Sequence, residues 1–396
     1  MILHFMYNTI VNRFTNIIRF GVWVVESVLL KDNAIASTKN SRNYGIDALR
    51  ILSMFFVLVL HVLGHGGVLS NTVVFTSQYE VAWFLEIGAY CAVNCYAVIS
   101  GYVGVNSKYK YSSIATLWFR VLFYSFSITL LFKILGIGSI RYVALLFSAR
   151  PVLSGQYWYF TAYFAMFMFI PLLNIAINKL NKRQLGILIF TMFFLFSCTS
   201  ICKYVFGESF KLSGGYSAWW LIILYIFGGY IKRYDLFPKI KRYVWLILYF
   251  TMVILTWLLK LILEIRPVGV FNSNILVSYI SPTITLSAIC LLMFFKDLEF
   301  KSVTNKIIAF LSPLAFSVYL IHNHPLINKY MLKDSLSSLA NLPAIVLPFA
   351  VIGVSLGIFI VCCAIDLIRE QLFKVLKIKQ RLNNLEYKYI GDLWKT

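Results

Sequence analysis

Residues 44–66, YGIDALRILSMFFVLVLHVLGHG, decide the fold class, because they form an apolar run long enough to cross a bilayer. Arg50 stands near one end of this run and His61 near the other, with nothing ionisable between them. Eleven positions at about 100° per residue end about 20° beyond three full turns, so both side chains share one helix face, roughly 16 Å apart along the axis. An arginine in a membrane segment is costly, so we expect this face to line a polar cavity.

The composition of the whole chain is also that of a membrane protein. Hydrophobic residues make up 60% of the sequence and charged residues only 13%, whereas soluble domains carry about 25% charged residues. The net charge of +21 would suit a nucleic-acid binder, but the basic residues lie in short loops between apolar runs. We therefore expect membrane lipids, and no nucleic acid, around the protein.

Seven cysteines lie in or beside apolar runs, and no CxxC or Cys/His metal spacing occurs. Cysteines in such runs usually pack as small apolar side chains. The sequence therefore predicts neither a disulfide framework nor a bound metal.

Ten apolar runs predict an all-α integral membrane protein with about ten transmembrane helices. Residues 1–45 are expected to be an extension with an interfacial amphipathic helix, residues 46–368 the membrane domain, and residues 369–396 a basic cytoplasmic tail. The predicted spans are about 46–66, 83–105, 114–135, 157–178, 185–205, 216–231, 243–263, 275–295, 307–327 and 342–368.

The lysines and arginines of the loops predict the orientation. Alternate loops on one side, including both termini, hold 25 of the 36 Lys and Arg residues, and the loops on the other side hold 8. Because basic loops stay in the cytoplasm, both termini are predicted to be cytoplasmic.

Two histidines are expected to meet at one depth. In this orientation the first and ninth spans both run outward, and His61 and His322 each lie fifteen residues past the start of their span. An imidazole can abstract or donate a proton near neutral pH. A buried histidine can also be a hydrogen-bonded core residue, but the matched depth and the nearby arginine favour a functional pair. We expect His65 and His324 to be interfacial, nearer the outer boundary.

Arg50 has an acidic neighbour, Asp47, three residues earlier at the start of the span. One interpretation is a structural pair, in which the carboxylate also complements the helix N-terminus. The other, which we favour, is an arginine held in place to bind a phosphate or carbonyl of an anionic cytosolic donor. Arg120, at a similar inner depth in the third span, is expected to add to the same positive pocket.

The second span, AVNCYAVISGYVG, carries a small pair, Ser100 and Gly101, which lets a ligand or another backbone come close. No GxSxG elbow surrounds Ser100, so a nucleophilic role is not supported. Asn94 in the same span is a buried amide that needs hydrogen-bond partners.

An aromatic cluster opens the fourth span, at residues 156–171, QYWYFTAYFAMFMFIP. By composition it is an interfacial aromatic belt at the outer boundary, although such rings could also stack on sugars. The cluster consists of Tyr157, Trp158 and Tyr159.

Four of these elements together resemble one family. The Arg-x10-His arrangement of Arg50 and His61 is similar to the signature of the membrane acyltransferase-3 family, bacterial enzymes that O-acylate surface carbohydrates. ISGY in the second span resembles its Phe-Phe-x-x-Ser-Gly-aromatic motif, and YWYFTAYFAMFMFIP its Trp-aromatic-Leu…Pro element. SVYLIH, with Tyr319 and His322, resembles its Ser-x-x-x-Tyr-Leu-x-His element.

The chain departs from the family pattern at two places, although the resemblance covers about residues 44–330. Asn94 stands where an acidic residue often precedes the Phe pair, and the pair itself is Cys95 and Tyr96. The third-span motif is reduced to Arg120, without its proline.

The resemblance implies an O-acyltransferase in the bacterial plasma membrane, with acyl-coenzyme A, most commonly the acetyl form, as donor substrate and no bound cofactor. Arg50 and Arg120, with Ser100 and Gly101, would bind the donor from the cytosolic side, and its thioester would reach His61.

On the acceptor side, a surface sugar would enter past the aromatic cluster at 157–159. His61 would act as general base or carry the acyl group covalently, and His322 would relay the proton or orient the acceptor. Asp47, Asn94 and Tyr319 would support these groups.

The residues alone are also compatible with two other classes of protein. A cation in a membrane cavity suits a transporter or flippase of sugar-linked or anionic substrates equally well. A non-catalytic subunit of a polysaccharide synthase is the other alternative.

Overall fold

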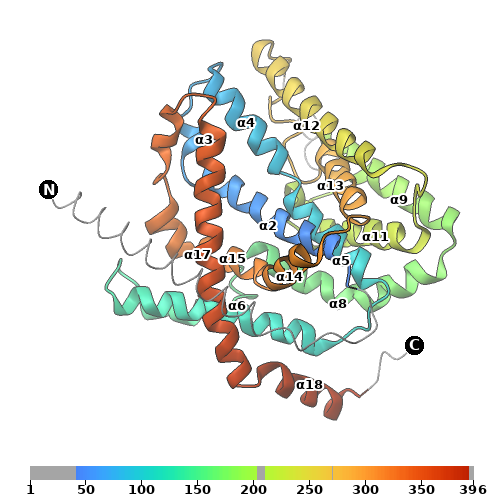
Figure 1. Ribbon diagram of the computed structural model, residues 1–396, viewed down its shortest axis with the longest axis vertical. Coiled ribbons are helices and arrows are strands. Elements are labelled where there is room, and N and C mark those ends of the chain that lie inside the picture. The colour runs from blue at the N-terminus through green and yellow to red at the C-terminus, as the bar shows by residue number, and fades with distance from the viewer. Residues whose placement is uncertain (1–41, 203–209, 270, 392–396) are drawn as a thin grey trace.

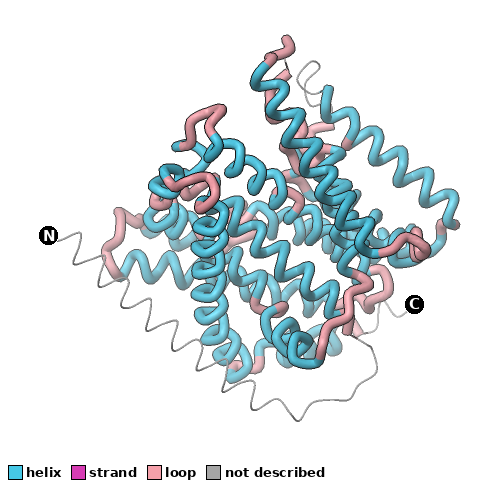
Figure 2. Tube along the Cα trace, turned by 45° about the horizontal axis from the view of Figure 1, so that its top comes forward, coloured by secondary structure: helices cyan, strands magenta, loops and turns pink. Residues whose placement is uncertain are grey.

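The computed structural model describes residues 42–202, 210–269 and 271–391. Within these ranges the chain is helical, and Figure 2 shows helices joined by loops without a strand. The interfacial helix expected in residues 1–45 lies almost entirely outside the described residues.

Eight helical stretches of the described chain are long and apolar enough to cross a membrane. Four of them are α6 (Tyr111–Ile134), α8 (Trp158–Lys179), α12 (Arg242–Ile265) and α17 (Leu347–Val375). The other four join consecutive elements: α2 (Tyr44–Leu63) with α3 (Val68–Asn71), α4 (Ser77–Ala89) with α5 (Ala92–Gly104), α9 (Lys182–Phe196) with η1 (Cys198–Cys202), and α14 (Ser302–Leu311) with α15 (Ala315–His322). The chain is therefore a multi-pass membrane protein.

The two remaining predicted spans are shorter helices. They correspond to α11 (Ala218–Tyr234), with 17 residues, and α13 (Pro282–Phe295), with 14. A membrane-crossing helix needs about 20 residues, so the count of ten stays a prediction. The remaining helical elements are α7 (Tyr142–Ser148), η2 (Ser213–Gly215), α16 (Pro325–Ile327), η3 (Asn328–Leu332), η4 (Ser337–Asn341) and α18 (Ile378–Tyr389).

The ninth predicted span is broken at Pro313, between α14 and α15. Proline has no N–H to donate and disfavours helix at the residue before it. The break exposes polar groups of the loop: the Ser312 hydroxyl donates to Asp47, and the Pro313 carbonyl accepts from Arg120. One loop therefore contacts two of the charged residues that the sequence singles out.

Helices α5 and α11 pack backbone to backbone through glycine. A Cβ atom on Gly101 would lie 1.9 Å from the carbonyl oxygen of Tyr225, and one on Gly228 would lie 2.0 Å from that of Val98. Both distances are shorter than any real contact, so only glycine fits at this crossing.

Helix α2 lies near the centre of the bundle, where α5, α15 and α17 all pack against it. Figure 1 shows α17 crossing the bundle beside α2 and α15, with α18 turned back beneath α6. The boundary predicted at residue 368 falls inside α17, which continues to Val375. Glu386 of α18 accepts hydrogen bonds from the backbone amides of Tyr111 and Ser112, at 2.7 and 3.2 Å, and so caps α6.

Candidate active site

The histidine pair lies where α2 and α15 meet. Nδ1 of His61 is 2.8 Å from Nε2 of His322, and Nδ1 of His322 is 2.5 Å from the carbonyl oxygen of Val318 one turn earlier. His322 is only 3% exposed. The two imidazoles that the sequence places at one depth are therefore in direct contact.

This chain of contacts fixes which nitrogens carry protons. A backbone carbonyl only accepts, so Nδ1 of His322 must be the donor to Val318. In a neutral His322 this is the single N–H, and Nε2 is left as an acceptor for the N–H at Nδ1 of His61. A neutral His61 then keeps an unprotonated Nε2. The arrangement leaves one free lone pair on His61, oriented by His322.

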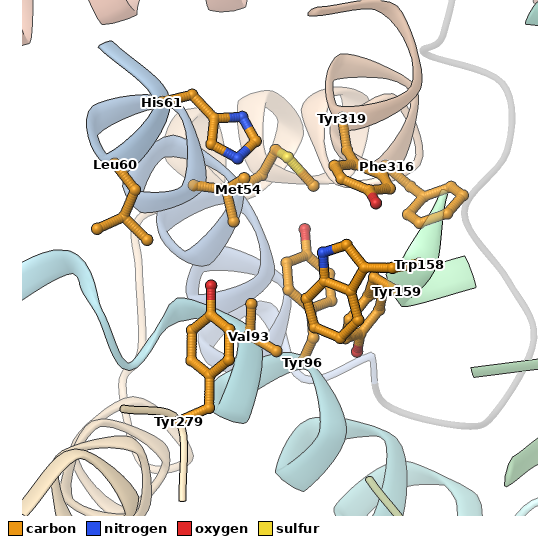
Figure 3. A pocket seen from close by; sticks show the side chains of 11 residues that line it. Met54, Leu60, His61, Val93, Tyr96, Trp158, Tyr159, Tyr279, Phe316 and Tyr319 are labelled. Atoms are coloured by element: carbon orange, nitrogen blue, oxygen red, sulfur yellow. The ribbon is translucent and has the colours of Figure 1, made fainter. Parts of the chain in front are cut away.

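His61 borders a small pocket with aromatic walls. Figure 3 shows one ring nitrogen of His61 directed toward the space between these rings. The volume of about 40 Å³ exceeds the roughly 10–15 Å³ that a cavity needs to hold one water molecule, so the pocket has room for a few waters. The aromatic residues around the pocket are Tyr96, Trp158, Tyr159, Tyr279, Phe316 and Tyr319.

The aromatic residues at the start of α8 lie in two places: some line this pocket, and one is buried in the core. Trp158 and Tyr159 line the pocket, and Trp158 packs on the ring of Tyr279 with 6.0 Å between ring centroids. Tyr157 does not line it: its ring is fully buried and its hydroxyl donates to the carbonyl of Leu320 at 2.8 Å. The prediction that Tyr157 contacts the acceptor is therefore corrected, because its polar group is already used to join α8 to α15.

Asn94 supports the pocket from behind. Its side-chain amide donates to the carbonyl of Tyr279 at 2.7 Å, and its side-chain oxygen accepts from the indole N–H of Trp220 at 3.1 Å. Asn94 is fully buried, so both ends of the amide have the partners that burial demands. Asn94 thus fixes the backbone that carries Tyr279.

Arg50 lies on the same helix but lines a different cavity. Its guanidinium donates to Asp47 at 2.7 Å, and Asp47 also accepts from Arg42 and, at 3.0 Å, from Ser312. The cavity beside them, which we call the α2 cavity, has a volume of about 680 Å³ and includes Arg42, Asp47, Arg50, Tyr102, Lys232, Ser312 and Pro313 in its wall. Asp47 thus holds Arg50 at the wall of a cavity large enough for a ligand.

Arg120 does not join Arg50 in one pocket, which corrects the prediction. It lines a second cavity of about 920 Å³, the α18 cavity, and among the described residues Pro313 alone borders both cavities. The break at Pro313 places a loop between the two arginines. Arg120 donates to the Pro313 carbonyl at 2.9 Å, while its buried Nε has no partner among the described residues. The other cations of the α18 cavity are Lys110, Arg369, Lys374, Lys377 and Lys379.

The pair Ser100 and Gly101 borders neither cavity nor the histidine pocket. The Ser100 hydroxyl donates to the carbonyl of Tyr96 within α5. Gly101 contacts the backbone at Tyr225, as described above. A donor-binding role for this pair is therefore replaced by helix packing, the other of the two uses that small residues allow.

The two further histidines differ from each other. His65 is exposed, and its ring stacks on that of His61 at 4.6 Å. His324 is 1% exposed and caps α16 by accepting from the backbone amide of Leu326, so it packs inside the protein, while its predicted position near the outer boundary stays a prediction. Within the described ranges, no group of three His, Cys, Asp or Glu residues could hold a metal ion.

Tyr279 and Met54 are pocket residues that the sequence does not single out. Tyr279 stands in the loop before α13, where no helical periodicity gives its direction. Met54 lies in α2 between Arg50 and His61 and looks like any other apolar residue of a span. The one feature of the sequence that could have identified Met54 as a pocket residue is its position near the helix face of Arg50 and His61.

Comparison with known proteins gives one match. The model of the acyltransferase-3 family, described as an acyltransferase domain, matches residues 43–367. No curated protein and no solved structure matches the chain. The matched range contains the histidine pair, the aromatic pocket and the α2 cavity, and it ends just before Arg369 and α18.

Proposed function

The chain belongs to the acyltransferase-3 family, and from this membership we propose that it is an O-acyltransferase of the bacterial plasma membrane. The donor is cytosolic acyl-coenzyme A, with acetyl as the first acyl group to test. The acceptor is a hydroxyl of a cell-surface or exopolysaccharide sugar. Both termini lie in the cytoplasm, as the basic loops predict.

One observation carries this proposal: His61 keeps a free Nε2 lone pair at an aromatic pocket while His322 holds its other nitrogen. A general base needs a free lone pair within reach of the proton that it removes. The backbone carbonyl of Val318 completes the chain of hydrogen bonds that orients the imidazoles. The three groups are therefore arranged as base, orienting group and anchor.

The donor is expected to bind in the α2 and α18 cavities, away from the histidine pocket. Coenzyme A carries several phosphate charges, and the α2 and α18 cavities both have cationic walls. Guanidinium groups bind phosphate through paired N–H donors. Arg50, held by Asp47, and Arg120, whose Nε has no partner in the described part of the chain, would bind phosphate or pantetheine groups of the donor.

The acceptor suits the aromatic pocket. Aromatic rings offer flat apolar faces to sugar rings, and a few polar groups then fix the orientation. Trp158, Tyr159 and Tyr279 would supply these faces. Since the pocket has a volume of only about 40 Å³, substrate entry requires side chains to move, and the flexible Met54 at the wall is suited to this.

In the proposed reaction, Nε2 of His61 takes the proton of the sugar hydroxyl as the oxygen attacks the thioester carbonyl. General-base catalysis of this kind typically contributes about 10²–10⁴-fold. The same lone pair could instead attack the thioester first and form an acyl-histidine. The two routes differ in whether label ever becomes attached to the protein.

Purified protein in lipid, given labelled acetyl-coenzyme A and candidate glycans, tests the function. We expect label in the glycan, a loss of about 10²–10⁴-fold in His61→Ala, and near wild-type transfer in the control Arg183→Gln, at an exposed residue that borders neither the pocket nor the two cavities. Label trapped on the protein after rapid denaturation at neutral pH, where an acyl-imidazole survives longest, marks the acyl-histidine route. Unchanged transfer by His61→Ala, present at the wild-type level, would overturn the assignment. Movement of a sugar substrate without transfer would identify a transporter, and neither transfer nor movement would point to a non-catalytic subunit.

A further inference from the structure

The N-terminus of α8 opens on the histidine pocket. This helix has 22 residues, and its N-cap residue, Tyr157, makes no side-chain capping bond. The first amides of an α-helix have no acceptor within the helix, and the helix dipole gives them a partial positive charge. Trp158 and Tyr159, the first two residues of α8, line the pocket. An electropositive helix end, without a cap from its N-cap side chain in the described structure, therefore borders the space beside His61.

The hydroxyl of Tyr319 provides a second, independent donor at the same place. Tyr319 is 5% exposed and lines the pocket, and among the described residues its buried hydroxyl makes no hydrogen bond of ordinary geometry, with the backbone of Tyr159 and the side chain of Asn323 as its polar neighbours. Figure 3 shows this hydroxyl oxygen on the pocket side of the ring, facing Trp158. An unpaired buried polar group costs about 1–3 kcal/mol. A group kept in this state at a pocket is suited to a partner that arrives with the substrate.

A hydrogen bond holds the two donors in a fixed relation. The Tyr157 hydroxyl donates to the carbonyl of Leu320, the residue after Tyr319, at 2.8 Å. The rings of Tyr157 and Tyr319 also pack against each other, with centroids 5.8 Å apart. The start of α8 is thereby fixed to α15. Donors fixed before the reaction need no reorganisation when negative charge develops.

We infer that the Tyr319 hydroxyl and the first-turn amides of α8 form an oxyanion site for the acyl-transfer reaction. This inference rests on the proposed function. The acceptor oxygen forms a bond to the thioester carbon, its proton passes to Nε2 of His61, and the C=O electron pair moves onto the carbonyl oxygen. Tyr319 and α8 donate hydrogen bonds to that oxyanion. The electron pair then returns, the C–S bond breaks, and the leaving thiolate takes the proton from His61.

Two coenzyme A analogues separate this role from simple donor binding. In trifluoroacetonyl-coenzyme A the carbonyl carbon adds water and becomes tetrahedral, whereas acetonyl-coenzyme A stays a planar ketone. We expect the full-length wild-type protein in lipid to bind the trifluoro compound more tightly. Tyr319→Phe should lose this preference by about tenfold or more and lower kcat by about 10²-fold, with little change in KM for acetyl-coenzyme A.

Tyr249→Phe is the matched control. It removes a phenol hydroxyl that donates to the carbonyl of Gly88, away from the pocket, so kcat and the analogue preference should stay as in the wild type. If the wild type binds neither analogue, the proposed donor is wrong. If it binds both and Tyr319→Phe keeps the full preference and kcat, the donor stands and the oxyanion site is refuted.

Discussion

Nδ1 of His61 lies 2.8 Å from Nε2 of His322, although 261 positions separate the two residues in the chain. The contact joins α2 to α15 and makes His322 the acceptor for the single N–H of a neutral His61. The N–H at Nδ1 of His322 donates to the backbone carbonyl of Val318. His322 therefore orients the base through an acceptor atom, and a side chain that keeps an acceptor at this position should preserve part of the function.

Substitution of His322 tests this orienting role. In His322→Gln the side-chain oxygen can replace Nε2 as acceptor, whereas His322→Leu leaves the N–H of His61 without a partner. We expect His322→Leu to lose at least about tenfold more kcat than His322→Gln, because an unsatisfied buried donor costs about 1–3 kcal/mol. Steady-state transfer with purified proteins measures the difference. Equal losses in both variants would contradict an orienting role.

Arg120 is expected to act on donor affinity. Losing a charge-assisted hydrogen bond costs about 1.5–3 kcal/mol, which corresponds to about 10–10²-fold in binding. Arg120→Gln should therefore raise KM for acetyl-coenzyme A by about that factor and leave kcat nearly unchanged. Arg183→Gln is the control, because Arg183 is an exposed cation that borders none of the three cavities described above. A KM that rises equally in both variants would indicate only a general charge effect.

The glycine crossing of α5 and α11 gives a prediction about folding. Gly101→Ala and Gly228→Ala would each place a Cβ atom about 2 Å from a backbone oxygen, so the helices must separate. Overpacking of this kind costs about 1–3 kcal/mol or more. We expect lower thermal stability in detergent for both variants. Gly357→Ala in α17, where a Cβ atom would meet nothing within 4 Å, should be as stable as the wild type, and a similar loss there would refute the explanation.

The sequence predicts more about the single helix than about its neighbours. Helical spacing in 44–66 places Arg50 and His61 on one face, and the loop charges lead to His322 as a residue of equal depth. The separation of Arg50 from Arg120 depends on the break at Pro313, which a hydropathy pattern does not show.

Other contacts of the site depend on tertiary packing alone. Tyr279 reaches the pocket from a loop, where its direction depends on the hydrogen bond from Asn94. Gly101 has the small size that both a ligand site and a helix crossing require, and only the position of α11 decides between them.

Lys260 and Glu264 form a charged pair in α12, and neither residue borders the histidine pocket, the α2 cavity or the α18 cavity. Lys260 is 2% exposed, and its ammonium group pairs with Glu264, donates to the Tyr79 hydroxyl at 2.9 Å and lies 4.1 Å from the centre of the Trp83 ring. The pair replaces the hydration that both charges lose on burial.

We expect Glu264→Leu alone to destabilise the protein by about 3–5 kcal/mol, because it leaves a buried ammonium group without its counter-ion. The double variant Lys260→Met/Glu264→Leu removes both charges. Its free energy of unfolding should lie within about 1 kcal/mol of the wild-type value, since replacing a buried pair by apolar residues is often neutral. Thermal unfolding in lipid nanodiscs compares the three proteins. Acetyl transfer by the double variant should equal that of the wild type. A double variant as unstable as Glu264→Leu would mean that Lys260 stabilises α12 by packing against Tyr79 and Trp83 rather than through its charge.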